Sequence, residues 1–540
     1  MFPRQKNSMK RIAKLFYSDK ILIFLTICIS LISFCYFYFH GQQNLSYGDA
    51  ISRLNIARKI IDSITPGFGQ LGAIWLPFPT VLMIPFIWSD FLWHSGIAGA
   101  IISGTAFIFG AVYLKKTMYL ITKDTAASLL VWLIFVTNIN VLFFQSMAMS
   151  ESFFLFSVIM TLYFLSKWML DQEITNYLLA AFFVMLGTLT RYEGYFVLVG
   201  SLVTISICLI MQNVRNKNFP KIEGMILLFL SVASYGIFLW CLYCLIFFKN
   251  PFHWLSLYSG GDGTLIPSAS QQRNLLNSFS SYTQITIWMC GIVVFFLGLI
   301  GYLMLIITFI KDLLKKHDIS RYLPLITIST LLFFLLIYGY QKGYIPPVDF
   351  ESITLQHILS KKFDFFLSNS IQSNIPNIRY GIEMLPFIAL FVGFFASRAR
   401  ILFFMILLLV VFQIYTNYQT SLLLQFSIPY AARYNILPAA VWFQSHYTGD
   451  GLILISDNAN EDFMFETGLS YNHFIYEGTR EYWRTSLTNP SKYADWVVIQ
   501  TKLSGDFVYD SMKLTNFAML KKQFRLVYSD NKGYEIYRRI

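Results

Sequence analysis

The sequence predicts a polytopic α-helical membrane protein that carries a small α/β domain at its C-terminal end. Of its 540 residues, 56% are hydrophobic and only 13% are charged, which lies outside the usage of soluble globular domains. The apolar residues gather in eleven runs, most of them long enough to cross a bilayer, and positive charges gather in alternate connecting segments. Together these observations indicate that lipid faces much of the chain.

The apolar runs predict about 11 transmembrane helices, because a spanning helix needs roughly 20 predominantly apolar residues. The fifth run is the shortest. Residues 75–88 form a further apolar stretch, but fourteen residues with three prolines suit a segment at the outer surface better than a full crossing. The predicted spans are 21–40, 97–114, 125–143, 151–169, 177–189, 195–211, 224–248, 284–310, 322–340, 383–396 and 401–416.

Charge placement predicts that the N-terminal segment, residues 1–20, lies in the cytoplasm. It holds six Lys or Arg and one acid, and the long apolar run behind it lacks a small-residue cleavage site, which favours a retained anchor. With this orientation the inner segments hold nineteen Lys and Arg against seven Asp and Glu. The whole net charge of +12 therefore falls on the cytoplasmic face, and no nucleic-acid partner is needed to explain it.

Three predicted outer loops are too long to be mere connections: 41–96, 249–283 and 341–382. In the first of them, apolar residues recur at helical spacing from Ile51 to Ile64. We expect an amphipathic helix there, lying on the membrane surface.

The C-terminal segment, residues 417–540, is richer in charge than the rest of the chain. Its apolar runs 451–457 and 496–500 predict strands, and Asn531-Lys532-Gly533 predicts the turn of a final hairpin. We interpret this segment as a small α/β domain on the outer face, joined to a transmembrane domain that extends over residues 21–416.

Ionisable residues are nearly absent from the middle of the predicted spans and cluster at their outer ends. This pattern disfavours a transporter, which needs polar groups or broken helices at mid-depth, and it favours a site at the outer surface. Each residue also has a simpler interpretation: Asp49 as a helix N-cap or a partner of Arg53, Glu151 as a first-turn acid, and Arg379 as an interfacial anchor. The clustered residues are Asp49, Arg53, Glu151, Arg191, Glu193, Arg379 and Glu383.

Acids and arginines at the outer surface fit the use of a lipid-delivered activated sugar. Because nucleotide-activated donors are made in the cytoplasm, an enzyme working outside needs its donor carried through the bilayer, and a polyprenyl phosphate does this. The leaving phosphate is already a stable anion, so a general acid is dispensable. Guanidinium groups for the phosphate and one carboxylate to accept the proton of the acceptor hydroxyl would suffice.

Several stretches resemble the GT-C polyprenyl-phosphate-dependent glycosyltransferases, on the branch of the protein O-mannosyltransferases and the lipid A aminoarabinosyltransferases. GDAISRLNIAR resembles their first outer loop, and TPGFGQLGAIWLPFPTVLMIPF resembles the end of that loop. SMAMSESFFLFSVIMTLYFL, LTRYEGYFVL and RYGIEMLPFIALFVG are similar to the family's small acidic loop and its two arginine-bearing helix starts. The resemblance covers most of the chain to about residue 416 in order and topology.

The resemblance implies a catalytic base and a set of binding residues. Asp49 matches the proposed base. Arg379, with Arg191 or Arg53, would bind the donor phosphate. The residues implied to orient groups or sugar are Glu151, Glu193 and Tyr380.

Two departures bear on the donor sugar. Many relatives carry an Asp-Glu pair where this chain has Asp49-Ala50, and the aminoarabinose branch has Lys-Pro-Pro where this chain reads Leu76-Pro77-Phe78-Pro79. Some relatives use a divalent metal, but the seven histidines are scattered, so we predict that no metal or other cofactor is required.

The predicted function is that of an inverting glycosyltransferase in the plasma (inner) membrane, with its partners a polyprenyl-phosphate sugar and an acceptor hydroxyl on a glycan, lipid or protein. Three alternatives stay open from the sequence: a polymerase or ligase of lipid-linked glycans, a flippase for the same lipid, and a scaffold that displays the C-terminal domain.

Overall fold

The computed structural model describes residues 19–213, 219–258, 274–315, 317, 319–343, 345, 347–348, 375–427, 437–503, 505–514 and 517–540. The predicted cytoplasmic N-terminus and the middle parts of the second and third outer loops lie largely outside these residues. The described residues form two compact units. The first runs up to Ser33 and includes Gly104–Gln145 and Ser150–Gln425; the second comprises Phe34–Ser103, Ser146–Met149 and Phe426–Ile540.

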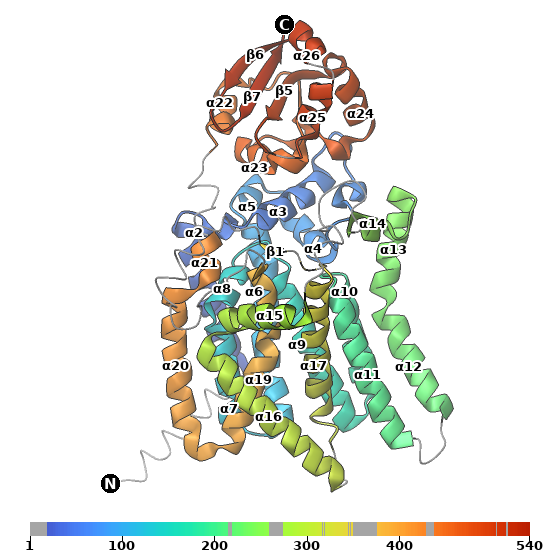
Figure 1. Cartoon of the computed structure of the whole chain (residues 1–540), viewed down its shortest axis with the longest axis vertical. Coiled ribbons are helices and arrows are strands. Elements are labelled where there is room, and N and C mark those ends of the chain that lie inside the picture. Colours follow the sequence, from blue (N-terminus) through green and yellow to red (C-terminus); the bar gives the residue numbers. More distant parts are fainter. Residues whose placement is uncertain are drawn as a thin grey trace. The chain divides into compact units, whose positions relative to one another are not determined.

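Long apolar helices make up the first unit (Figure 1). Two short strands, β1 (Pro347–Val348) and β2 (Ile375–Pro376), pair antiparallel just before the 3-10 helix η4 (Ile378–Met384). Its α-helices, of which α2, α6 and α21 have residues in both units, are α2 (Asp19–Phe39), α6 (Ile97–Thr122), α7 (Thr125–Val136), α8 (Ile139–Gln145), α9 (Glu151–Asp171), α10 (Ile174–Thr188), α11 (Gly194–Asn213), α12 (Phe219–Ala233), α13 (Tyr235–Phe248), α14 (His253–Tyr258), α15 (Leu275–Cys290), α16 (Ile292–Leu314), α17 (Leu323–Gln341), α19 (Leu385–Arg398), α20 (Phe403–Thr420) and α21 (Leu422–Ser427).

Each of the eleven predicted spans overlaps one or two helices. Among the described residues, eight helices are long and apolar enough to cross a membrane, and the bent pairs α7–α8 and α12–α13 bring the number to ten if each pair is one span. Helix α10, at the fifth predicted span, has only 15 residues. The doubtful stretch 75–88 contains a ten-residue helix, α4 (Phe78–Ile87), with Pro85 inside it. The protein is therefore a multi-pass membrane protein, as predicted.

The prediction of one continuous helix over 284–310 is wrong, because these residues belong to two helices, α15 and α16. The chain turns at Gly291, which has a φ of 90°, a value that glycine adopts readily and other residues rarely do. Residues before this point belong to α15 and residues after it to α16. In Figure 1, α15 runs across the long axis that the neighbouring helices follow. A Cβ at Gly291 would lie 2.7 Å from the Gln413 side chain, which accepts a hydrogen bond of 2.7 Å from the Val293 amide. The turn therefore needs glycine for both its conformation and its space.

Small residues allow α16 to pack closely on α19. A Cβ built at Gly301 would lie 2.0 Å from the Phe391 carbonyl oxygen, and one at Gly298 would lie 2.7 Å from the Ile388 side chain. Such close backbone approach is typical of membrane helix interfaces, where packing replaces the hydrophobic effect as the driving force.

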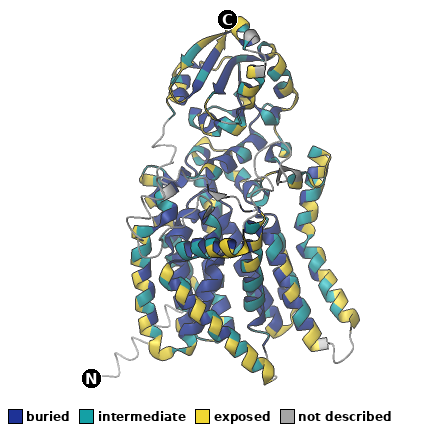
Figure 2. Cartoon of the chain, in the orientation of Figure 1, coloured by how far each residue is buried: buried dark blue, intermediate teal, exposed yellow. Residues whose placement is uncertain are grey.

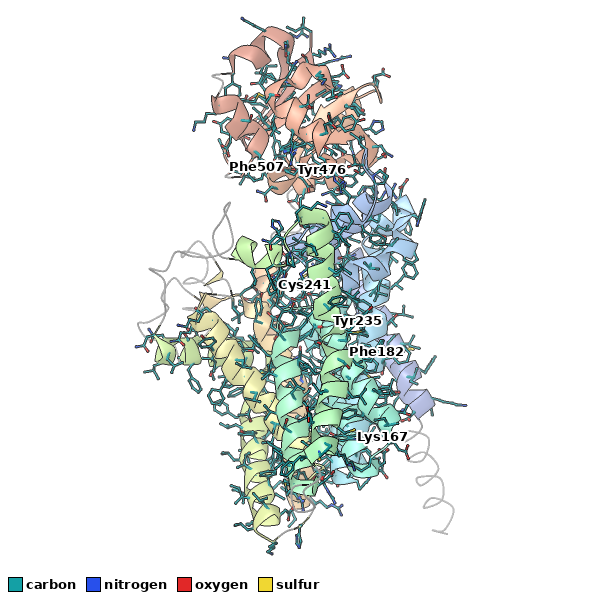
Figure 3. The ribbon with its side chains drawn as sticks, turned by 90° about the vertical axis from the view of Figure 1, so that its right-hand side faces the viewer. Lys167, Phe182, Tyr235, Cys241, Tyr476 and Phe507 are labelled. Carbon is teal, nitrogen blue, oxygen red and sulfur yellow. The ribbon has the colours of Figure 1, made fainter. Side chains whose placement is uncertain are left out.

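Figure 2 shows exposed residues along the outer helices, and many of them are large hydrophobic residues. On α20, Phe404, Leu408 and Phe412 recur every four residues and are 59–75% exposed, as expected of a stripe that faces lipid. Figure 3 looks onto the side formed by α10, α12 and α13, where the labelled Phe182 and Tyr235 are likewise exposed.

In the second unit, the first of the loops predicted to lie outside, residues 41–96, folds into helices. They are joined by Arg58, which donates to Asp62 Oδ2 at 2.8 Å and to the Ile87 carbonyl at 2.9 Å and pairs with Asp90 at 2.7 Å. The helices are η1 (Gln43–Leu45), α3 (Gly48–Ile61), η2 (Phe68–Leu71), α4 and α5 (Asp90–His94).

The C-terminal segment of the second unit forms a five-stranded mixed sheet with the order β4-β3-β5-β7-β6. β3 lies parallel to β4 and β5, whereas β7 is antiparallel to both β5 and β6. The strands are β3 (Leu452–Leu454), β4 (Phe474–Ile475), β5 (Ala494–Gln500), β6 (Phe524–Ser529) and β7 (Tyr534–Arg539). Both predicted strands and the predicted hairpin are confirmed, and Gly533 supplies the positive φ of 101° at its turn.

Helices flank this sheet and complete its hydrophobic core, in which Leu454, Val497 and Ile499 are fully buried. The helices are α22 (Pro438–His446), α23 (Asp457–Thr467), α24 (Glu481–Thr488), α25 (Phe507–Leu514) and α26 (Ala518–Gln523), with the short 3-10 helices η8 (Tyr471–His473), η9 (Glu477–Thr479) and η10 (Pro490–Lys492) between them.

Candidate active site

The first unit brings together charged residues from four helix ends. Glu151 begins α9, Arg191 and Glu193 lie between α10 and α11, and Arg379 and Glu383 lie on η4 ahead of α19. Successive membrane helices alternate in direction, so the sequence predicted that these ends share one side of the membrane. Their direct contacts confirm that they meet.

Arg191 lies at the centre of this cluster. Its Nη1 donates to Glu151 Oε1 at 2.8 Å and to Ser150 Oγ at 3.2 Å, and its Nε donates to Glu193 Oε2 at 3.1 Å. Its Nη2 lies 3.2 Å from Glu383 Oε1. The guanidinium thus faces three carboxylates, and its side chain is only 7% exposed. The resemblance implied Arg191 as one of the candidate ligands of the sugar-donor phosphate. In the structure, its Nε, Nη1 and Nη2 atoms all face oxygen atoms of the protein itself.

Arg379 has a more open position. Its side chain is 14% exposed, and its Nε lies 3.6 Å from Glu151 Oε1. The ring of Tyr380 lies between the two arginines, 4.8 Å from the Arg191 guanidinium carbon and 5.6 Å from that of Arg379. The geometry therefore favours Arg379 over Arg191 as a ligand for an anion.

The turn that carries Arg379 and Tyr380 is held against α15. Tyr282 donates to the Tyr380 carbonyl at 3.2 Å, and a Cβ at Gly381 would lie 2.4 Å from the Ile285 carbonyl oxygen. No larger residue fits at this position without moving η4 or α15.

Glu383 is a cluster member to which the sequence assigned no role. It is 1% exposed, and its Oε2 has no hydrogen-bond partner among the described residues. With Glu151 and Glu193 it gives the cluster three acids against two arginines. Its place near Arg379 in the sequence was visible, but nothing local indicated that its carboxylate would reach Arg191, nearly 200 residues earlier in the chain.

Asp49 and Arg53, the predicted base and a predicted phosphate ligand, belong to the second unit, on α3. Asp49 lies in the first turn and is half-buried; the N-cap is Tyr47, so the alternative interpretation of Asp49 as the N-cap is not supported. The helix N-terminus suits a carboxylate here. Arg53, one turn later, is buried with its guanidinium carbon 4.9 Å from the centre of the Trp75 ring.

Helix α3 differs from the predicted surface helix. The apolar stripe is buried at Ile51, Leu54 and Ala57, but the polar residues Ser52 and Lys59 on the other side are buried as well. The first-loop helices cover one face of α3 and helix α23 of the C-terminal segment covers another. The helix is therefore enclosed rather than half-exposed.

Burial raises the pKa values of three acids of α23, which are Glu461, Asp462 and Glu466. Burial, with a further contribution from Asp457, raises the pKa of Glu461 to about 8, and burial raises the pKa of Glu466 to about 7, from an ordinary 4.5. Since the folded state holds these protons more tightly than the unfolded state does, their stabilising contribution is complete below about pH 4.5 and is lost as the pH rises toward 8.

We therefore expect thermal unfolding of the purified protein to occur at a lower temperature at pH 8.5 than at pH 5.5. For each tenfold increase in a carboxylate's proton affinity on folding, the free energy of unfolding changes by about 1.4 kcal/mol between these pH values. Scanning calorimetry across this range measures it, and Glu461→Gln should flatten the slope. If the unfolding temperature of Glu461→Gln falls with pH as steeply as that of the wild type, the pH dependence comes from other groups.

Among the described residues, no group of three or more His, Cys, Asp or Glu side chains is arranged to hold a metal ion. Independence of a metal stays a prediction.

Two solved structures share the architecture of this chain over nearly its whole length. ArnT from Cupriavidus metallidurans bound to undecaprenyl phosphate gives a TM-score of 0.51 at 9% identity, and its apo state gives 0.50 at 13% identity; each comparison covers 96% of this chain and 98% of that chain. AglB from Archaeoglobus fulgidus, in complex with an inhibitory peptide and a dolichol-phosphate, gives 0.45 at 10% identity over 97% of this chain and 74% of its own.

No protein-family model and no curated protein matches the sequence. The likeness to ArnT is therefore one of fold, and it confirms the fold that the quoted motifs implied. The protein shares its fold with ArnT from Cupriavidus metallidurans.

Proposed function

We propose that this protein is an inverting glycosyltransferase that moves a sugar from a polyprenyl phosphate to an acceptor hydroxyl at the outer face of the membrane. The observation that carries the proposal is the fold match over 96% of the chain to ArnT, a protein solved with undecaprenyl phosphate bound. The cluster around Arg191 and Arg379 supports the proposal. The Arg379 side chain is partly exposed, and the ion pairs of Arg191 hold the helix ends around it together.

The proposed reaction forms one bond and breaks one. The acceptor oxygen attacks the anomeric carbon of the donor sugar, and the bond from that carbon to the phosphate oxygen breaks. The electron pair leaves on the phosphate, and the proton of the hydroxyl passes to Asp49. Attack from the face opposite the leaving group inverts the configuration.

The role of each candidate residue follows from its surroundings. Arg379 binds the departing phosphate, because its guanidinium is the more exposed of the two in the cluster. Arg191 holds Glu151, Glu193 and Glu383 in place.

The test is a comparison of lipid-linked sugars by mass spectrometry in membranes from cells with and without the protein. We expect one polyprenyl-phosphate monosaccharide to accumulate without it and to fall again when the wild type is restored. This result identifies the donor in the same spectrum. An unchanged pool overturns the proposal.

The same samples separate the alternatives. Accumulation of a lipid-linked oligosaccharide would indicate a ligase or polymerase. If the protein is a flippase, its loss traps the monosaccharide on the cytoplasmic face, where it resists a membrane-impermeant reagent in sealed spheroplasts. If the protein is a transferase, its loss leaves the monosaccharide accessible from outside.

Replacing Arg379 by Gln should weaken donor use and disturb the fold less than a change at Arg191 does, because Arg379 is the more exposed of the two. We expect kcat/KM for the lipid donor to fall about 10²-fold, in line with the loss of a charge-assisted contact to phosphate worth up to about 3 kcal/mol. The measurement is transfer by purified protein across a range of donor concentrations. Arg400→Gln is the matched control, since Arg400 is 80% exposed and pairs with Asp124. Equal kinetics of Arg379→Gln and wild type would exclude Arg379 as the phosphate ligand.

A further inference from the structure

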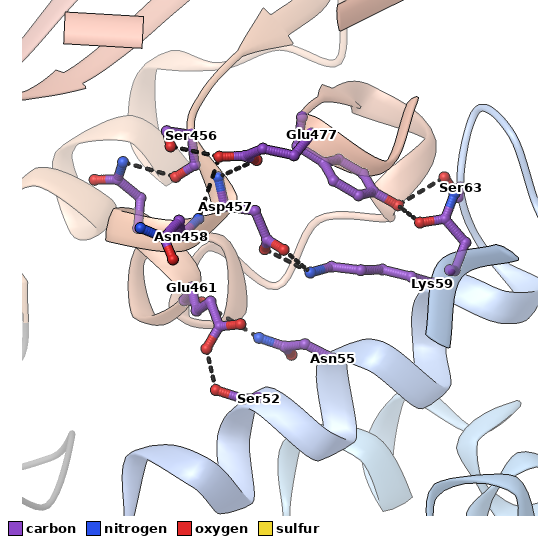
Figure 4. A network of polar contacts seen from close by, with 12 residues as sticks. Ser52, Asn55, Lys59, Ser63, Ser456, Asp457, Asn458, Glu461 and Glu477 are labelled. Carbon is purple, nitrogen blue, oxygen red and sulfur yellow. Dashed lines mark hydrogen bonds and ion pairs between the residues drawn. The ribbon is translucent and has the colours of Figure 1, made fainter. Parts of the chain in front are cut away.

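The C-terminal domain of the second unit contacts α3 through buried polar groups (Figure 4). Lys59 of α3 lies 2.5 Å from both carboxylate oxygens of Asp457 on α23. The Lys59 side chain is only 2% exposed, against 21% for Asp457. The aromatic rings of Tyr471 and Tyr476 lie 5.2 and 5.0 Å from its ammonium nitrogen. A lysine this deeply buried is held by its carboxylate partner and by the two ring faces.

Contacts one and two turns earlier on α3 repeat this pattern. Ser52 donates to the Glu461 carboxylate, and Asn55 donates to the Glu461 main-chain carbonyl at 3.4 Å. Asn55 also accepts a hydrogen bond from the Trp93 indole at 3.3 Å, which ties this point to α5. The buried polar side of α3 therefore faces residues of α23 over two full turns.

The far end of α3 is fixed by the loop before η9. Asp62, just past the helix, accepts hydrogen bonds from Ser470 at 2.5 Å and from Asn472 at 2.8 Å. Tyr476 exchanges a hydrogen bond of 2.8 Å with Ser63 and donates to Gln70 at 3.0 Å. The contacts thus continue beyond the C-terminus of the helix.

Hydrogen bonds within the C-terminal domain fix the backbone around Asp457. Glu477 accepts hydrogen bonds from the Ser456 hydroxyl at 2.5 Å and from the Asp457 amide at 2.8 Å, at the start of α23. These bonds fix the backbone that presents Asp457 to Lys59. The geometry on both sides of the ion pair is therefore determined by the fold rather than by flexible side chains.

We infer that the C-terminal domain is a clamp that sets the position of α3, and that Lys59 is the positioning residue through which it acts on Asp49. Lys59 lies ten residues after Asp49, about 15 Å along one continuous helix. A shift or tilt at Lys59 is therefore carried to the first turn. The part of this inference that concerns Asp49 rests on the proposed function, whereas the clamp itself does not.

The clamp is tested by hydrogen exchange of the full-length protein, which needs no activity. We expect Lys59→Met and Asp457→Asn to speed amide exchange in peptides covering Gly48–Ile61 at least tenfold and to leave peptides of α9 unchanged. The exposed Lys492 supplies the matched control, Lys492→Met, which should leave α3 as in the wild type. Unchanged exchange in α3, or equal acceleration in α9, would overturn the inference.

Catalysis is tested by the same variants. Lys59→Met should lower kcat about 10²-fold with KM for the lipid donor changed less than threefold, because a small displacement of a catalytic group costs rate rather than donor binding. Exchanging the two charges, Lys59→Asp with Asp457→Lys, should restore at least a tenth of the lost rate. A rise in KM with unchanged kcat overturns the positioning role.

The two proposals fail in distinguishable ways. If the wild-type protein shows no transfer and its absence leaves the lipid pool unchanged, the proposed function is wrong, and the exchange data still decide whether the clamp exists. If transfer is measured and Lys59→Met transfers at the wild-type rate, the function stands and the positioning role of Lys59 is wrong.

Discussion

Asp49→Asn is expected to lower kcat for sugar transfer about 10²- to 10⁴-fold, the range that general-base catalysis contributes. Asparagine keeps the size of the side chain and one acceptor oxygen but cannot accept the proton of the acceptor hydroxyl. Because Asp49 lies within the first turn of α3 and is not its N-cap, the substitution leaves the helix start largely intact. The fall should therefore appear in kcat and not in the amount of folded protein.

The measurement is single-turnover transfer with purified protein, together with the lipid-linked sugar pool in cells that carry the variant. Asp90→Asn is the control: Asp90 is another acid of the same loop, its side chain is 74% exposed, and it pairs with Arg58. If Asp49→Asn clears the donor pool as fast as the wild type does, Asp49 is not the base.

Arg191→Met is expected to abolish folding or to reduce the yield of folded protein severely. The substitution leaves Glu383 without the cation that faces it and leaves Glu151 with Arg379 alone, and both acids are 1% exposed. Breaking a buried ion pair by removing one partner typically costs about 3–5 kcal/mol, a large part of a protein's net stability. We expect aggregation or a strongly lowered melting temperature in detergent, measured by fluorescence-detected size exclusion.

Two further variants make this result specific. Arg400→Met removes an arginine that is 80% exposed and should fold like the wild type. Combining Arg191→Met with Glu151→Gln, Glu193→Gln and Glu383→Gln removes the unpaired charges and should recover much of the folded protein. If Arg191→Met alone folds normally and only raises KM for the donor, Arg191 is a phosphate ligand, as the sequence suggested, and not the centre of a structural cluster.

The features that the sequence predicted well are those with a local signal. Apolar runs of sufficient length marked the helices, and the alternation of helix direction explains why Glu151, Arg191 and Arg379 could be placed at one side from their positions alone. The kink at Gly291 was missed because apolar residues continue on both sides of it, so hydropathy carries no sign of the turn.

Partner choice among charged residues was beyond the sequence for a different reason. Lys59 stood in a predicted surface helix, where lysine is ordinary, and its partner Asp457 lies almost 400 residues later. Similarly, Arg191 looked like a cation available to a ligand because the three carboxylates that face it come from three separate helix ends. The catalytic assignments that came through the GT-C resemblance, Asp49 first among them, stay predictions that the variants above will test.

The contact between Gly381 and the Ile285 carbonyl bears on how this chain can vary during evolution. A residue with no functional group is constrained as tightly as its charged neighbours, since even the smallest side chain would move η4, which carries Arg379, or α15. Selection at such a site acts on volume alone. Its codon should therefore tolerate only synonymous change, even in lineages where the surrounding charges are free to adapt to a different sugar.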